Sequence, residues 1–294
     1  MAASQARRRH HRRRPTDDAV TTPALAGLIA TIASTRGDAA RRKLELSLVK
    51  KLPKETIVNE LTAAFEANQK ARFIYPEILG VLHRRRIPTV KQAVRPLLLD
   101  KDRSVRANAA RLVSEYGWGD DFIPELRRIV AREASQATST ALIPALEALG
   151  AARTDEAFEA LLAAAKVPFK NPWRRGNLLM ALAAKQRPEV RSLFEKVTRA
   201  KEHPYVRQGA AVGLARLGDR RALDRLRADF DSTDMRIGTS ASIALKGIVG
   251  TPVAVSGAQL QRLARWWDAH PAEVVARFEK FIAARVAKRS AATR

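Results

Sequence analysis

Histidine, cysteine and carboxylate side chains are the usual carriers of catalysis and metal binding, and here their arrangement forms no recognisable reactive site. The five histidines show no metal-binding spacing, and the chain has no cysteine. His10 and His11 lie among arginines that would repel a cation, and His203 and His270 each precede proline, so we expect capping or solvation there. No phosphate-binding loop or nucleophile elbow is present. We predict no catalytic residue, no metal and no cofactor.

Clustered basic side chains are the remaining chemical signal, because guanidinium groups bind phosphates and carboxylates well. Residues 84–111 contain nine Lys or Arg, and residues 166–191 contain seven. Two interpretations stay open: contact with an anionic partner, or a solvated surface on which the long side chains cover apolar helix. The candidate anion-binding residues are Arg41, Arg42, Lys43, Arg84, Arg85, Arg86, Arg174 and Arg175.

The formal net charge of +24 favours an acidic partner. Residues 1–14 contribute +6 and residues 277–294 contribute +5, which leaves +13 for the residues between them. We expect residues 1–22 to form a disordered basic arm. An export signal, an organellar transit peptide and an expression artefact remain alternatives for this arm. No apolar run reaches the roughly 18 residues that a membrane span needs, so we expect a soluble, cytoplasmic protein.

An apolar pattern that recurs seven times must position these side chains. It starts at positions 40, 74, 105, 138, 174, 206 and 237, and the residues four and eight positions later are apolar in every copy. Spacings of 31 to 36 residues are typical of stacked pairs of antiparallel helices. The sequence therefore predicts an all-α, right-handed solenoid of about seven to eight helix pairs.

Residues with helix-capping chemistry fall at matching places in the copies. Asp102, Ser135, Asn171 and Asp234 each lie three residues before a start, where an N-cap is expected. Glycines twelve residues after a start suit helix C-termini, and they are Gly117, Gly150 and Gly218. We predict repeats over residues 23–250, a linker at 251–257, two capping helices within 258–289 and a disordered basic tail at 290–294.

Two stretches resemble HEAT repeats: residues 102–113 and residues 203–219. The second resembles the short bacterial subtype also found in phycobilisome-lyase-like proteins. This resemblance implies that an aspartate before a helix and an arginine inside it link neighbouring repeats, and Asp102 with Arg106 fits that pattern, as does Arg207 at the arginine position. It implies a fold rather than an activity.

HEAT-like DNA glycosylases provide an enzymatic alternative, because they hold DNA in a basic groove lined with tryptophan. This chain has Trp118, Trp173, Trp266 and Trp267, but no catalytic aspartate can be aligned with that setting. A lyase-like enzyme is a further alternative. We expect a non-enzymatic scaffold or adaptor whose basic curved surface binds an acidic protein or a nucleic acid. Aromatic residues make up only 5% of the chain, so nucleic acid would be contacted mainly through its phosphates.

Overall fold

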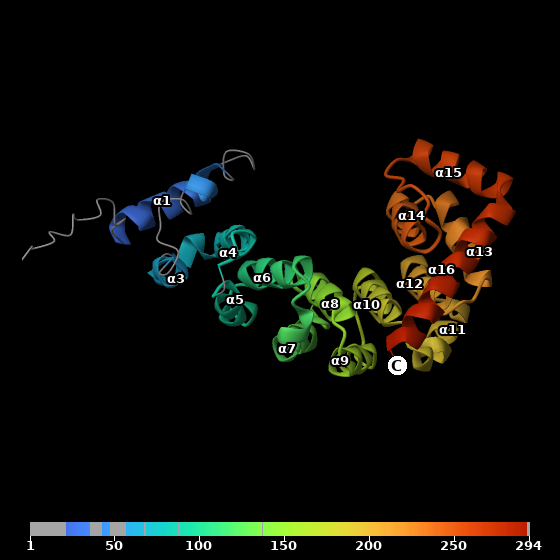
Figure 1. Cartoon of the computed structure of the whole chain (residues 1–294), viewed down its shortest axis with the longest axis horizontal. Helices are drawn as coiled ribbons and strands as arrows, with labels where there is room; N and C mark the ends of the chain where they lie inside the picture. Colours follow the sequence, from blue (N-terminus) through green and yellow to red (C-terminus); the bar gives the residue numbers. More distant parts are fainter. Residues whose placement is uncertain are drawn as a thin grey trace, which may run out of the picture. The chain divides into compact units, whose positions relative to one another are not determined.

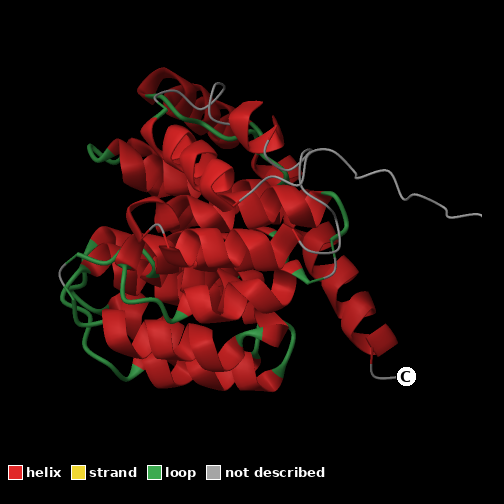
Figure 2. Ribbon diagram, turned by 90° about the vertical axis from the view of Figure 1, so that its left-hand side faces the viewer, coloured by secondary structure: helices red, strands yellow, loops and turns green. Residues whose placement is uncertain are grey.

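The computed structural model describes residues 22–35, 43–47, 57–67, 69–87, 89–136 and 138–292. These residues form helices joined by short loops and contain no strand (Figure 2). The prediction of an all-α solenoid is therefore confirmed. The chain divides into two compact units, residues 1–93 and residues 94–294. Residues 1–21 of the predicted arm lie outside the described residues.

The first unit has a core that α1 (Thr22–Ser34), α3 (Ile57–Ala67), η1 (Gln69–Ile74) and α4 (Tyr75–Arg84) build together. The rings of Phe65 and Tyr75 stack with centroids 4.7 Å apart, and both side chains are buried. The Tyr75 hydroxyl lies 2.6 Å from Thr62 Oγ1. The aromatic stack thus joins α3 to α4, and the hydroxyl of Tyr75 keeps a polar partner.

Helices of the second unit form two rows (Figure 1). The first row consists of α6 (Arg103–Glu115), α8 (Leu142–Ala151), α10 (Pro172–Lys185), α12 (Pro204–Arg216) and α14 (Met235–Val249). The second row contains α7 (Ile123–Glu133), α9 (Asp155–Ala165), α11 (Arg191–Arg199) and α13 (Arg221–Ala228). α5 (Val90–Leu98) precedes α6, and the short helices η2 (Gly119–Asp121), η3 (Pro188–Val190) and η4 (Asp229–Asp231) lie in connections. Successive first-row helices pack on one another, as stacked repeats require.

Every first-row helix except α8 begins with the same capping geometry. Asp102, Asn171 and Asp234 each accept a hydrogen bond from the backbone N–H two residues later, which confirms their predicted role. His203 does the same through Nδ1. The prediction for Ser135 is wrong: α8 begins at Leu142, whose N–H donates to the hydroxyl of Ser139, because the preceding loop extends further than the periodicity suggested.

Glycines allow α12 to approach its neighbours closely. A Cβ atom on Gly209 would lie 2.7 Å from the Gly176 carbonyl oxygen of α10, and one on Gly213 would lie 2.3 Å from the Phe194 ring of α11. Gly117 and Gly218 follow their helices with positive φ, as predicted. Gly150 does not, because it lies inside α8 against Ala181 of α10.

The C-terminal helices are α15 (Gly257–Ala269) and α16 (Pro271–Ala292). The stretch we predicted as a linker, 251–257, is held against α14: Thr251 and Ala254 are buried, and the Ala254 N–H donates to Ser242 Oγ at 3.0 Å. Its last residue, Gly257, already belongs to α15. Part of the tail predicted at 290–294 is helical, because α16 continues through residue 292, and residues 293–294 lie outside the described residues.

Two glycine substitutions test this packing. Gly209→Ala should lower the free energy of unfolding by about 2 kcal/mol, since the backbone of α10 must move. Gly247→Ala, within α14, should raise it by about 0.5–1 kcal/mol through helix propensity, because a Cβ atom at this position would meet open space. Denaturation followed by circular dichroism measures both. Equal effects would contradict the close approach of α10 and α12.

Candidate anion-binding surface

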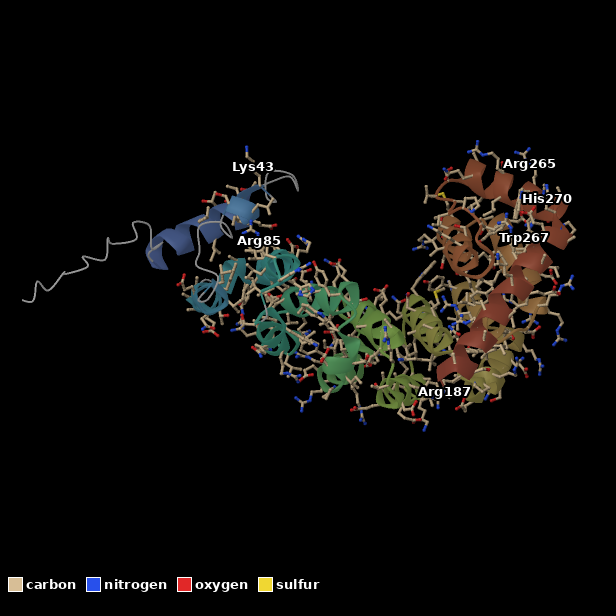
Figure 3. The ribbon with its side chains drawn as sticks, in the orientation of Figure 1. Lys43, Arg85, Arg187, Arg265, Trp267 and His270 are labelled. Atoms are coloured by element: carbon tan, nitrogen blue, oxygen red, sulfur yellow. The ribbon has the colours of Figure 1, made fainter. Side chains whose placement is uncertain are left out.

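The predicted basic clusters of the first unit lie at the surface. Lys43 is exposed in a short helical segment, and Arg84, Arg85 and Arg86 are exposed where α4 ends. Figure 3 labels Lys43 and Arg85. Arg86 has a φ of 61°, which turns the chain away from the helix axis. The predicted residues Arg41 and Arg42 lie outside the described residues.

Arg174 and Arg175 do not form the exposed pair that we expected. Arg174 is 5% exposed and donates to the carbonyl oxygens of Gln136 and Ser139, in the loop before α8. The anion-binding prediction for Arg174 is therefore corrected, because its donors are already used inside the stack. Arg175 remains partly exposed and pairs with Glu202 at 2.7 Å.

The predicted repeat-linking residues have different contacts from one another. Arg106 is buried, and its Nε and Nη2 donate to Glu133 Oε1 at 2.9 and 2.7 Å, which joins α6 to α7. Its Nη1 donates to the Asp100 carbonyl at 2.7 Å. Asp102 caps α6 and is not the partner of Arg106 in these bonds. Arg207 is exposed, and among the described residues no hydrogen bond joins its side chain to a neighbouring repeat.

The acidic side chains of α7 are buried, and its arginines are exposed. Glu125 and Glu133 are buried, where they pair with Arg95 and Arg106 from the preceding helices. The helix also carries three arginines that are exposed and form no ion pair with a described residue: Arg127, Arg128 and Arg132. Arg128 and Arg132 are one helical turn apart, a spacing at which like charges repel. The arrangement leaves concentrated positive charge on one solvent-facing helix.

The next helix of the second row, α9, carries the opposite charge. Asp155, Glu156 and Glu159 are all exposed on it. Arg187, labelled in Figure 3, donates to Asp155 at 2.7 Å and lies over the Phe158 ring. Basic side chains return on α11 and α13 at Lys196, Arg199, Arg221 and Arg225. Exposed positive charge along this row is therefore interrupted.

A pocket of about 260 Å³ lies between α11, α12 and α13. Arg207 and Arg225 line it together with Gln208 and Asp229. The buried Gln208 amide donates to Asp229 Oδ2 at 2.7 Å and to the Ile237 carbonyl at 2.9 Å. Burial raises the pKa of Asp229 from 3.8 to about 6, although the bond from Gln208 and the charge of Arg207 oppose that rise. Two cationic side chains thus share a pocket with an acid that titrates near neutral pH.

Sequence reasoning missed the arginines of α7. Arg127 and Arg128 are adjacent in sequence, but what distinguishes them is that the two acids of the same helix are buried and paired with other helices. Glu125 and Glu133 share the face of Leu126, Ile129 and Val130, which is the buried face. Acids on an apolar face imply partners from neighbouring helices, so these acids form no ion pair with the exposed arginines of their own helix.

No group of three or more histidine, aspartate or glutamate side chains in the described part of the chain is placed to hold a metal ion. No helix formed by the described residues has the length and apolar character needed to cross a membrane.

Residues 169–246 match a protein-family model described as HEAT repeats. This range covers α10 to most of α14. No curated protein matches the chain by sequence. Among solved structures, human deoxyhypusine hydroxylase in complex with glycerol is similar at 16% identity and a TM-score of 0.29, covering 77% of this chain and 96% of that chain. A similarity this weak does not relate the activity of that enzyme to this chain.

The pH dependence of stability tests the environment of Asp229. Its raised pKa means that the folded state holds the proton more tightly than the unfolded state between about pH 4 and pH 6. Stability from this group is present below pH 4 and is lost as the pH rises through 6. The Asp229→Asn variant has no carboxylate to ionise at this position and does not lose this stability. The free energy of unfolding of the variant minus that of wild type should therefore increase by about 2 kcal/mol from pH 4 to pH 7.

Chemical denaturation at several pH values measures this difference. Asp224→Asn is the matched control, because Asp224 is exposed on α13. Parallel pH profiles for wild type and Asp229→Asn would show that Asp229 is solvated like Asp224.

Proposed function

We propose that this chain is a non-enzymatic HEAT-repeat scaffold of the cytoplasm that binds an acidic protein through exposed arginines of its second-row helices. The carrying observation concerns the charges of α7. Glu133 pairs with Arg106 inside the stack and the buried Glu125 pairs with the half-exposed Arg95, while three arginines face solvent without an ion-pair partner among the described residues. We also propose that the repeats belong to the short bacterial HEAT subtype, because residues 203–219 resemble it. The repeats supply the rigid surface, and the arginines supply recognition.

An acidic protein fits this surface better than a continuous polyanion does. A nucleic acid that followed the row from α7 to α11 would pass α9, where Glu156 and Glu159 are exposed and only Asp155 is paired, with Arg187. Those carboxylates would repel phosphates, whereas a protein can place separate acidic patches against the arginines. The nucleic-acid alternative depends on the +24 net charge, which is a property of the whole chain.

Charge reversal on α7 tests the proposal. The triple variant Arg127→Glu, Arg128→Glu and Arg132→Glu should weaken binding of fluorescent polyglutamate by about tenfold or more at low salt, as loss of several charge contacts predicts. Fluorescence anisotropy at two salt concentrations measures the affinity. Duplex DNA and RNA of similar length serve as competitors.

A second triple variant controls for net charge. Lys246→Glu, Arg265→Glu and Lys280→Glu change three exposed residues on α14, α15 and α16 and alter the formal charge by the same six units. This variant should keep most of the polyglutamate affinity. Equal losses of polyglutamate affinity in both variants would show that only overall charge matters. Tighter binding of DNA or RNA than of polyglutamate would favour the nucleic-acid function instead.

A further inference from the structure

A second recessed site lies at the C-terminal end of the stack. A pocket of about 590 Å³ opens between the end of α14, the loop at 251–256, α15 and α16. Pro252, Val253, Ala254 and Leu263 give it mostly apolar walls, and Trp266 stands at one side. The volume is within the range of ligand-binding pockets and can accommodate a large apolar side chain. The second-row arginines of α7 do not line this pocket.

The walls of this pocket are held in place by bonds within the protein. The Ala254 N–H donates to Ser242 Oγ at 3.0 Å, and the Val255 N–H donates to Gln259 Oε1 at 2.8 Å. These bonds fix the loop to α14 and α15. A pocket with fixed walls loses little conformational entropy when it binds a ligand.

Trp266 is already in contact with other rings and charges. The Arg277 guanidinium lies 5.3 Å from its ring centroid, and the His270 ring stacks at 5.4 Å with an interplanar angle of 17°. A nucleobase would need an open aromatic face, so these contacts disfavour base stacking here. The apolar walls formed by Val253 and Leu263 are better suited to an aliphatic or aromatic side chain.

The charged side chains that line the pocket are both arginines. Arg262 lines it, is exposed and forms no ion pair with a described residue. Arg277 also lines it, and this residue donates to Glu273 at 2.5 Å and to the Val249 carbonyl at 3.4 Å. None of the described residues that line the pocket is acidic. The guanidinium of Arg262 at an apolar pocket is complementary to a carboxylate beside an apolar anchor.

We propose that this pocket binds a short acidic segment of a partner protein, with one bulky apolar side chain against Val253 and Leu263 and a neighbouring carboxylate on Arg262. Such a segment combines a buried anchor with a charged rim contact, which is the usual division of roles at a small interface. The chain's own termini do not complement the site, because residues 1–14 and 277–294 are strongly basic.

Two fluorescein-labelled peptides provide the test. One carries leucine and phenylalanine between pairs of glutamates, and the other has alanines in place of these two residues. We expect the first to bind about tenfold or more tightly than the second, because only it has an anchor. Val253→Glu should weaken binding of the first peptide about tenfold, whereas Val255→Glu, which changes an exposed residue outside the pocket lining, should change it less than about twofold.

Arg262→Glu and Arg265→Glu form a second matched pair, since both arginines are exposed on α15 and only Arg262 lines the pocket. Arg262→Glu should lower the affinity about tenfold and Arg265→Glu less than about twofold. Circular dichroism melting identifies any variant that fails to fold. Equal binding of the two peptides, equal effects within either matched pair, or displacement of the first peptide by oligouridylate RNA would overturn the proposal.

The α7 triple variant separates this pocket from the arginine surface. It should retain peptide binding at the pocket, because α7 contributes no lining residue. If this variant binds both the peptide and polyglutamate as tightly as wild type does, the function proposed for α7 is refuted and the pocket proposal stands. Loss of peptide binding in that variant would refute the pocket as an independent site.

Discussion

Close packing between successive first-row helices is the constraint on which the second unit depends. No repeat has a core of its own, so each must bury its apolar face against the next. At Gly209 the backbone of α12 lies directly against the Gly176 carbonyl of α10, because neither glycine has a side chain to separate them. Buried charged groups then need partners from neighbouring segments of the stack, as Glu133 of α7 supplies for Arg106 of α6. Stacking and polar pairing are therefore set by the same helix contacts.

This constraint also decides where charge remains available. An acid that pairs inside the stack no longer neutralises an arginine on its own helix. Glu125 and Glu133 form ion pairs with Arg95 and Arg106. The exposed arginines of α7 form no ion pair with a described residue. In contrast, α9 places its carboxylates outward. Formal net charge therefore describes this surface poorly, because the distribution of ion pairs between interior and exterior differs from helix to helix.

The sequence predicted the features that depend on local rules. Apolar spacing located the helices, and the caps at Asp102, Asn171 and Asp234 follow from side-chain chemistry next to a helix start. Features that need distant partners were missed. Arg174 occupies a start position of the apolar pattern, which places it inward, while Arg175 is rotated about 100° around the helix and reaches solvent. The pocket near Trp266 joins segments whose packing no local pattern specifies.

The bonds of Arg174 also bear on how the repeats can diverge. Its guanidinium is held by the backbone carbonyls of Gln136 and Ser139, and a carbonyl oxygen is present whatever side chain its residue carries. The loop before α8 can therefore change its side chains through mutation while it keeps this connection to α10. The length of this loop is constrained, however, since an insertion would move both carbonyls away from Arg174. Repeats joined in this way can drift in sequence and still keep their spacing.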